Sequence, residues 1–245
     1  MLHSRRIDNL IVALIFFAGL TLSLPVNAAM LEFWTSDGWT ILDAEDGVGN
    51  GGYVGPGWGG QAFDAEYLFY KQEGNKLSIG LQSGFDIING QQVYGGHTYY
   101  AGDLALGFNG GGYDYAIDFG LVTRNINGAK VGLGGSDQDA AGFYKATDWN
   151  NELSFAASAP FGMDEGAFIS GIGTSQGSGS GSYFRTATVD LNSLGFDVTS
   201  FSAHWTMSCG NDVVEGSASV PEPSGLLLML GGLLGLFGRL HRRKA

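Results

Sequence analysis

Short runs in which apolar and polar side chains alternate recur along the middle of this chain. The clearest is residues 113–121, YDYAIDFGL, where an aromatic or aliphatic side chain stands at every second position. Alternation with a period of two places the apolar side chains on one face of a β-strand. We therefore expect a strand that buries Ile117 and leaves Asp114 and Asp118 on a solvated face.

Similar β-prone patterns predict further strands. They occur in residues 65–70, 76–82, 103–108, 153–157, 167–172, 183–191 and 201–207. Residues 72–75 (QEGN) and 109–112 (NGGG) are turn-forming sequences between neighbouring runs and predict two hairpins. Residues 173–182, GTSQGSGSGS, resemble a flexible linker, but strand patterns resume on both sides. We interpret them as a mobile hairpin loop.

The fold class that these runs predict is all-β. About ten short strands at this spacing are typical of an antiparallel sandwich or a jelly-roll-like domain. No segment has the pattern of an amphipathic helix of ten or more residues, because the 42 glycines are too closely spaced for helices. We expect this glycine in turns and loops, where positive φ angles are needed.

The charge is unevenly distributed along the 245 residues. The whole chain has a net charge of −12, but six of its twelve lysines and arginines lie in the two end segments. Residues 29–223 therefore carry 23 acids against six bases, a net charge of −17. A domain this acidic repels nucleic acid, so we exclude nucleic-acid binding. Acidity of this kind also keeps a secreted domain soluble.

The first 28 residues have the organisation of a secretory signal peptide. Arg5 and Arg6 precede a continuous apolar run at residues 10–22, and small residues stand before Ala29. This pattern predicts cleavage by signal peptidase between Ala28 and Ala29, after export through the general secretion machinery. The alternative is an uncleaved N-terminal anchor, which the shortness of the apolar run disfavours.

The last 26 residues, 220–245, have three parts in a fixed order. Pro221, Glu222 and Pro223 form a stiff extended element, and an apolar run of 14 residues follows at 225–238. The run is shorter than the roughly 20 residues that span a bilayer, so we expect a short hydrophobic helix and a temporary anchor. A basic tail, which should stay in the cytoplasm, ends the chain: Arg239, Arg242, Arg243 and Lys244.

This three-part ending resembles the PEP-CTERM sorting signal of bacterial surface proteins. The resemblance implies a Gram-negative host and a membrane-embedded transpeptidase, exosortase, which recognises Pro221, Glu222 and Pro223. It also implies passage through the inner membrane to the cell surface or extracellular space, and an association with exopolysaccharide or biofilm. The alternative is an ordinary C-terminal membrane anchor.

The middle segment has few residues that could act as a nucleophile with a neighbouring base. Cys209 is the single cysteine, and only His97 and His204 remain after processing. We expect Cys209 to be a buried thiol; the alternative is an intermolecular disulfide. His204, on the strand at 201–207, should be a surface or edge residue. We therefore predict no catalytic residues and no enzyme activity.

Carboxylates and aromatic residues leave two carbohydrate-related alternatives open. Asp64 and Glu66 would share one strand face, as would Asp114 and Asp118, and paired carboxylates hydrolyse glycosides. Four aromatic residues offer rings on which sugars stack: Trp34, Trp39, Tyr53 and Trp58. The alternatives are a carbohydrate-binding module and a secreted glycoside hydrolase.

Calcium is the one metal for which the sequence offers candidate ligands. Asp43, Glu45 and Asp46 lie on one acidic segment, and Asp137 and Asp139 lie on another. Hard cations require six to eight oxygen ligands, and neither segment has the twelve-residue EF-hand pattern. We therefore expect solvated acidic turns and no cofactor.

The sequence thus predicts three units: a signal peptide (1–28), a glycine-rich β ectodomain (29–219) and a sorting signal (220–245). The predicted function is that of an exported, non-enzymatic surface or matrix protein.

Overall fold

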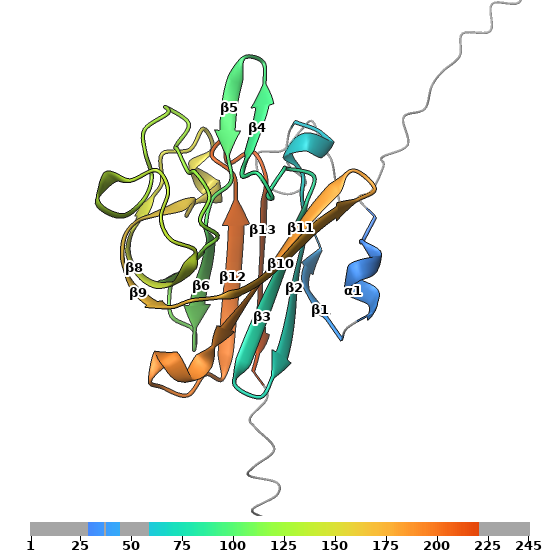
Figure 1. Ribbon diagram of the computed structural model, residues 1–245, viewed down its shortest axis with the longest axis vertical. Coiled ribbons are helices and arrows are strands. Elements are labelled where there is room, and N and C mark those ends of the chain that lie inside the picture. Colours follow the sequence, from blue (N-terminus) through green and yellow to red (C-terminus); the bar gives the residue numbers. More distant parts are fainter. Residues whose placement is uncertain (1–28, 37, 45–58, 221–245) are drawn as a thin grey trace, which may run out of the picture.

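A computed structural model describes residues 29–36, 38–44 and 59–220. These residues form two antiparallel β-sheets, which face each other, and a separate hairpin that projects from one end (Figure 1). The predicted all-β class is confirmed.

The first sheet has five strands in the order β1-β2-β3-β11-β10. Its strands are β1 (Thr40–Ala44), β2 (Ala65–Glu73), β3 (Lys76–Ser83), β10 (Gly173–Gly179) and β11 (Ser182–Asp190). The second sheet has six strands in the order β13-β12-β6-β7-β8-β9. Its strands are β6 (Leu104–Phe108), β7 (Tyr115–Asp118), β8 (Gly142–Asn150), β9 (Gly162–Ser170), β12 (Ser200–Thr206) and β13 (Val213–Ser219). The projecting hairpin consists of β4 (Gln91–Tyr94) and β5 (His97–Tyr100).

The core lies between the two sheets and takes side chains from both. Leu68, Ile79 and Val189 come from the five-stranded sheet, and Leu104, Ile117 and Trp205 come from the six-stranded sheet. Each of these six side chains is at most 1% exposed. Their burial is the main driving force for holding the sheets together.

Two hairpins form where the sequence predicted them. Gly74, at φ 60°, turns the chain between β2 and β3, and Glu73 pairs with Lys76 in the register of the two strands. Between β6 and β7, Asn109 and Gly110 have φ angles of 54° and 76°. Asparagine and glycine adopt such positive φ angles at the lowest cost, so the turn sequences set these positions.

Each sheet is also covered in part on its outer face. On the five-stranded sheet, helix α1 (Glu32–Ser36) brings Trp34 against Phe69, with the rings stacked at 4.2 Å. On the six-stranded sheet, Ala116, Tyr144 and Met163 form a second buried cluster. The sandwich therefore has apolar contacts outside its two sheets as well as between them.

This outer cluster contradicts one prediction about residues 113–121. The strand β7 is shorter than predicted, and Ile117 is fully buried as expected. Asp118, however, is only 5% exposed and not solvated, while Asp114 lies outside the strand and is exposed. The alternation correctly predicted the core-facing side chain Ile117, but the opposite face of β7 is also covered and is not exposed to solvent.

Two further predictions of local structure were wrong. Residues 153–157 do not form a strand; the segment contains only the 3-10 turn η3 (Ala156–Ser158). Residues 173–182 are not a mobile loop, because Gly173–Gly179 is strand β10, which pairs along its whole length with β11. Strands β1, β4, β5, β8 and β13 were not predicted.

Helical structure in the described part of the chain is brief. Besides the five-residue helix α1 there are four 3-10 turns. One is η3, and the others are η1 (Gln61–Phe63), η2 (Leu133–Gly135) and η4 (Leu191–Leu194). The expectation of no helix of ten or more residues is confirmed for these residues. No helix within residues 29–36, 38–44 and 59–220 has the length and apolar composition needed to cross a membrane.

Candidate functional sites

Val220, the last described residue before Pro221, is anchored in the sandwich. Val220 follows β13, is only 7% exposed and belongs to the main core cluster. Its backbone N–H donates to the carbonyl oxygen of Thr199 at 2.8 Å. The predicted sorting element therefore begins one residue after the last anchored residue of the domain.

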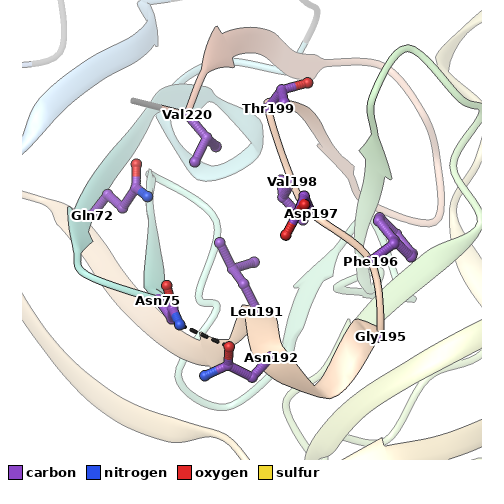
Figure 2. Close-up of a pocket in the computed structure, with 10 residues that line it drawn as sticks. All are labelled: Gln72, Asn75, Leu191, Asn192, Gly195, Phe196, Asp197, Val198, Thr199 and Val220. Atoms are coloured by element: carbon purple, nitrogen blue, oxygen red, sulfur yellow. Dashed lines mark hydrogen bonds between the residues drawn. The ribbon is translucent and has the colours of Figure 1, made fainter. Parts of the chain in front are cut away.

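A pocket of about 680 Å³ lies beside Val220 (Figure 2). The β2–β3 turn, η4 and the following loop line it, together with Val220. Its residues are Gln72, Asn75, Leu191, Asn192, Gly195, Phe196, Asp197, Val198, Thr199 and Val220. Across the pocket, Nδ2 of Asn75 donates to Oδ1 of Asn192 at 2.7 Å, as Figure 2 shows. Among these ten residues Asp197 is the one acid, so the lining offers hydrogen bonds and apolar contact but no nucleophile with a base.

A second pocket, of about 350 Å³, lies beside the projecting β4–β5 hairpin. It is lined by Gly59, Phe63, Tyr94, Tyr99, Ser154, Phe155, Cys209 and Asn211. The ring of Phe63 makes edge contacts with Tyr99 at 5.1 Å and with Tyr94 at 5.8 Å between centroids. Tyr94 is 65% exposed, so one wall of this pocket is an aromatic ring open to solvent.

Cys209 lies in the lining of this second pocket and is 7% exposed, which confirms the predicted buried thiol. Its thiol donates to Oδ1 of Asn211. Burial raises the pKa of the Cys209 thiol to about 11. Because the thiolate is the nucleophile, a thiol with so high a pKa is poorly reactive at neutral pH.

His204 contradicts the prediction of a surface or edge residue, because it is only 2% exposed. Its Nε2 lies 3.0 Å from the carbonyl oxygen of Ser158 and 3.1 Å from that of Pro160, so Nε2 carries a proton. Its Nδ1 lies 3.3 Å from Oε2 of Glu215, and the Tyr113 hydroxyl donates to the same oxygen at 3.5 Å. Burial lowers the pKa of His204 more than Glu215 raises it. Nε2 is therefore engaged by two backbone carbonyl groups, Nδ1 faces Glu215, and neither nitrogen bonds to Cys209.

The sequence missed that Ser158 and Pro160 belong to an irregular segment that covers the face of β12 carrying His204. An irregular connection has no periodicity, so no pattern in residues 151–161 indicated the cover. The local signal that existed was Pro160 itself, which disfavours a regular strand or helix there.

The carboxylates considered for glycoside hydrolysis do not form solvated pairs. Asp64 is 2% exposed and Glu66 is fully buried. Both oxygens of Glu66 accept hydrogen bonds from side chains, and burial raises the pKa of its carboxyl. Asp118 is buried whereas Asp114 is exposed, so that pair does not share an environment.

Buried carboxylates do gather at another place, on the outer side of the six-stranded sheet. Asp103 accepts from the backbone N–H of Met163 at 2.8 Å, and Asp118 accepts from that of Gly120 at 2.6 Å. Burial and the charge of Asp118 hold the pKa of Asp103 well above its usual range. Burial, with the charge of Asp139, raises the pKa of Asp118 to about 6. The sequence did not indicate that Asp103 is a buried carboxylate, because Asp103 is the polar first residue of the predicted strand at 103–108.

The calcium candidates that the structure describes lie on β1 and on the η2–β8 loop and already have partners. Asp43, on β1, accepts from the backbone N–H of Glu215 at 3.1 Å. Asp137 forms an ion pair with Arg124 at 2.5 Å, and Asp139 accepts from the N–H of Leu133 at 2.8 Å. Across residues 29–36, 38–44 and 59–220, no group of three or more His, Cys, Asp or Glu side chains is arranged to hold a metal ion. Glu45 and Asp46 lie outside the described residues.

The predicted aromatic platform is mostly internal. Trp34 is 3% exposed, and Trp39 is half-buried with its ring 5.1 Å from that of Trp34. Tyr53 and Trp58 lie outside the described residues. The second pocket instead offers one exposed aromatic ring, that of Tyr94.

Several predicted processing residues also fall outside the described part of the chain. They are Ala28, Pro221, Glu222, Pro223, Arg239, Arg242, Arg243 and Lys244. Ala29 is described, and its carbonyl oxygen accepts from Nε2 of Gln82 at 3.0 Å.

Comparison with protein families finds a PEP-CTERM protein-sorting motif at residues 219–244. This match agrees with the resemblance inferred from Pro221, Glu222 and Pro223 and extends through the basic tail. Comparisons with curated proteins and with solved structures found no match to the chain.

Proposed function

We propose that this chain is an exported cell-surface or extracellular-matrix protein, processed by exosortase, whose β-sandwich is a non-enzymatic module. The observation that carries the proposal is the sorting motif at residues 219–244, which starts where β13 ends. Signal peptidase and the general secretion machinery would act first, and the inner membrane would hold the protein only until exosortase acts. At the cell surface, the protein would be associated with exopolysaccharide.

The geometry at the end of β13 supports processing of the sorting motif without disruption of the sandwich. Val220 is held by the core and by Thr199, so the anchored part of the domain extends up to Pro221. Processing at or near Pro221, Glu222 and Pro223 would therefore leave the strands and their hydrogen bonds intact.

The non-enzymatic part of the proposal is supported by the groups that nucleophilic chemistry would need. The Cys209 thiol is bonded to Asn211 and has a raised pKa. His204 is buried, with Nε2 held by backbone carbonyl groups and Nδ1 facing Glu215. A nucleophile next to a free base is the minimum that such chemistry requires.

Replacing Pro221, Glu222 and Pro223 by alanine tests the sorting step. The apolar run and the basic tail remain, so the variant should stop in the inner membrane as an unprocessed precursor. Mass spectrometry of the wild-type surface fraction should find no peptide from residues 226–245. Glu165→Ala, an exposed acid on β9, is the control and should be processed normally. Recovery of residues 226–245 intact from the wild-type surface fraction contradicts the proposal.

A second candidate function, carbohydrate binding, is favoured by the aromatic pocket beside the β4–β5 hairpin. Tyr94 presents an exposed ring, with Phe63 and Tyr99 behind it, and Ser154 and Asn211 supply polar groups. Aromatic rings with a few polar groups are typical of ligand sites in concave surfaces. This pocket replaces the segment around Trp34 as the place where a sugar would bind.

A glycan array probed with the purified protein separates this candidate from a purely structural role. If a glycan binds, Tyr94→Ala should weaken binding about tenfold, which corresponds to about 1.4 kcal/mol. Val93→Ala is the matched control, since Val93 is equally exposed, at 65%, and neighbouring strand residues point to opposite faces. Equal effects of the two substitutions would remove the pocket from consideration. A reducing-sugar assay on the same glycan tests the glycoside hydrolase alternative.

A further inference from the structure

The side chain of Glu66 is fully buried on β2, and its hydrogen-bond partners are all uncharged. Its Oε1 accepts from Nε2 of Gln61 and from Oγ of Ser182, both at 2.6 Å. Its Oε2 accepts from Nε2 of Gln82 at 2.5 Å. Among the described residues no lysine, arginine or histidine forms an ion pair with Glu66. A buried carboxylate of this kind is costly unless an opposite charge lies close to it.

Gln82 connects this carboxylate to the N-terminal segment. The same Nε2 atom that donates to Glu66 also donates to the carbonyl oxygen of Ala29 at 3.0 Å. Its Oε1 accepts from the backbone N–H of Leu31 at 3.0 Å and from Nε1 of Trp34 at 2.7 Å. The side-chain amide of Gln82 thus holds residues 29–31 as the backbone of a neighbouring strand would.

The residues that Gln82 holds are also fixed by packing. Leu31 and Trp34 are 8% and 3% exposed and form one buried cluster with Phe69. The Leu31 side chain also lies close to Gly179 at the end of β10. The start of the described chain is therefore docked on the five-stranded sheet through both polar and apolar contacts.

Removal of the signal peptide would place a positive charge at this location. Cleavage between Ala28 and Ala29 turns the backbone nitrogen of Ala29 into an α-ammonium group. That nitrogen is three bonds from the carbonyl oxygen that Gln82 holds. The carbonyl oxygen of Ala29 and Oε2 of Glu66 share a single donor atom, so the new cation forms on the residue that Gln82 links to the buried carboxylate.

We propose that Glu66 and Gln82 form a binding site for the chain's own mature N-terminus, in which the α-ammonium of Ala29 is the counter-ion of Glu66. Ala29 is exposed, so the ammonium keeps part of its hydration while it faces the carboxylate. In the precursor this position holds an uncharged peptide N–H, and Glu66 has no cation. Signal-peptide removal and the final docking of helix α1 are then coupled. This inference depends on the export and cleavage that the proposed function includes.

Moving the amine while keeping the rest of the protein tests the proposal. Gly-Ser is inserted between Ala28 and Ala29, so that signal peptidase still cleaves after Ala28 but the amine lies two residues upstream. The processed protein is purified from the exporting cells, with and without Glu66→Gln. The insertion should lower the melting temperature by about 3 °C when Glu66 is present and should have little effect in Glu66→Gln. An equal effect in both backgrounds, or no effect in either, overturns the proposal.

A measurement on the unmodified protein does not depend on whether Glu66→Gln folds. The pKa of the Ala29 amine, followed by nuclear magnetic resonance of ¹³C-labelled alanine, should lie above the ordinary value of about 8, because a neighbouring carboxylate favours the charged amine. A pKa at or below that value overturns the proposal.

Mass spectrometry of the mature protein distinguishes a failure of the N-terminal site from a failure of the proposed export. A chain that begins at a residue other than Ala29 overturns the N-terminal site but leaves export intact. A chain that keeps residues 1–28 overturns both. A chain that begins at Ala29 without coupling to Glu66 overturns the N-terminal site alone.

Discussion

Both sheets bury carboxylates, but the surroundings of these groups differ. In the five-stranded sheet Glu66 is held by three neutral donors, and no other carboxylate contributes to the shift of its pKa. In the six-stranded sheet Asp103 and Asp118 each accept a backbone hydrogen bond and face further acids. One carboxylate lies in a cradle of neutral donors, whereas the others repel one another.

The difference indicates how each region should respond to change. Removing Glu66 takes the carboxylate acceptor away from donors on Gln61, Gln82 and Ser182, which costs stability whatever the charge of the carboxyl. Removing the charge of Asp118 relieves repulsion and desolvation and leaves an oxygen for the N–H of Gly120. The first group should therefore be needed for stability, and the charge of the second should be dispensable.

The largest effect is expected when a new charge enters the core between the sheets. Ile117 is fully buried in the core between the sheets, so Ile117→Asp adds an unpaired carboxylate to that core. The cost should approach the whole stability, about 5–15 kcal/mol for a domain, and the protein should unfold. Far-ultraviolet circular dichroism is the measurement. Val122→Asp, at a position that is 38% exposed, is the control and should fold. A folded Ile117→Asp would mean that the register of β7 is wrong.

Glu66→Ala should have the next largest effect. The donors on Gln61, Gln82 and Ser182 lose their acceptor inside the protein, which we expect to cost about 3 kcal/mol. Urea denaturation of the processed protein measures this cost. The exposed Glu165→Ala should change stability by no more than about 0.5 kcal/mol. A loss for Glu66→Ala as small as that of the control would show that the cradle does not constrain the fold.

The contrast between these two regions also shows where sequence patterns suffice. The alternation in residues 113–121 identified Ile117 as core, since a period of two is a local property of a strand. It wrongly left Asp118 in solvent, because the covering cluster of Tyr144 and Met163 comes from β8 and β9. Whether the second face of a strand is covered depends on distant segments, which the period does not record.

The Glu66 cradle was missed for a similar reason. Ser182, which donates to Glu66, is 116 residues away in the sequence, and Gln82 is 16 residues away. Only the pairing of β2 with β3 and of β3 with β11 brings these side chains together. Partners that meet through strand register leave no spacing motif.

Strand β10 was missed because its side chains carry almost no signal. Its sequence, GTSQGSG, lacks apolar residues, and it is held by backbone pairing with β11. Gly177 lies under the ring of Phe184, where an added Cβ would come within 2.5 Å of a ring carbon. Its glycine therefore permits close packing within the sheet, whereas the sequence alone suggested a flexible linker.

Asp118→Asn should reveal the opposite behaviour to Glu66→Ala. Asp118 is buried and interacts with Asp139, Arg185 and Asp103, and its pKa is about 6 against an ordinary value of 3.8. The folded state therefore binds the proton more tightly than the unfolded state, and the contribution of Asp118 to stability falls as the pH rises from about 4 to 6. Asp118→Asn should be more stable than the wild type by about 2 kcal/mol at pH 8 and nearly equal to it at pH 4.

Urea denaturation of both proteins at the two pH values measures this difference. The attraction of Arg185 for Asp118 is lost in the variant and works against the gain. A wild type that is more stable than Asp118→Asn at pH 8 would mean that this attraction outweighs burial and repulsion. The buried carboxylates Glu66 and Asp118 would then both stabilise the fold.

The smallest effect is expected from calcium, which would have to bind acids that are already engaged. Asp137 is paired with Arg124, Asp139 accepts from the backbone of Leu133, and Asp43 accepts from that of Glu215. A ligand that binds only the folded state raises the melting temperature by mass action. Millimolar calcium should raise it by less than about 2 °C beyond sodium chloride of equal ionic strength, as thermal denaturation will measure. A larger shift would indicate that Glu45 and Asp46 complete a site with Asp43, and Asp43→Asn should then abolish the shift while Asp139→Asn should not. The acids of the five-stranded sheet would in that case bind cations at β1 as well as beside Glu66, and the difference between the two sheets would widen.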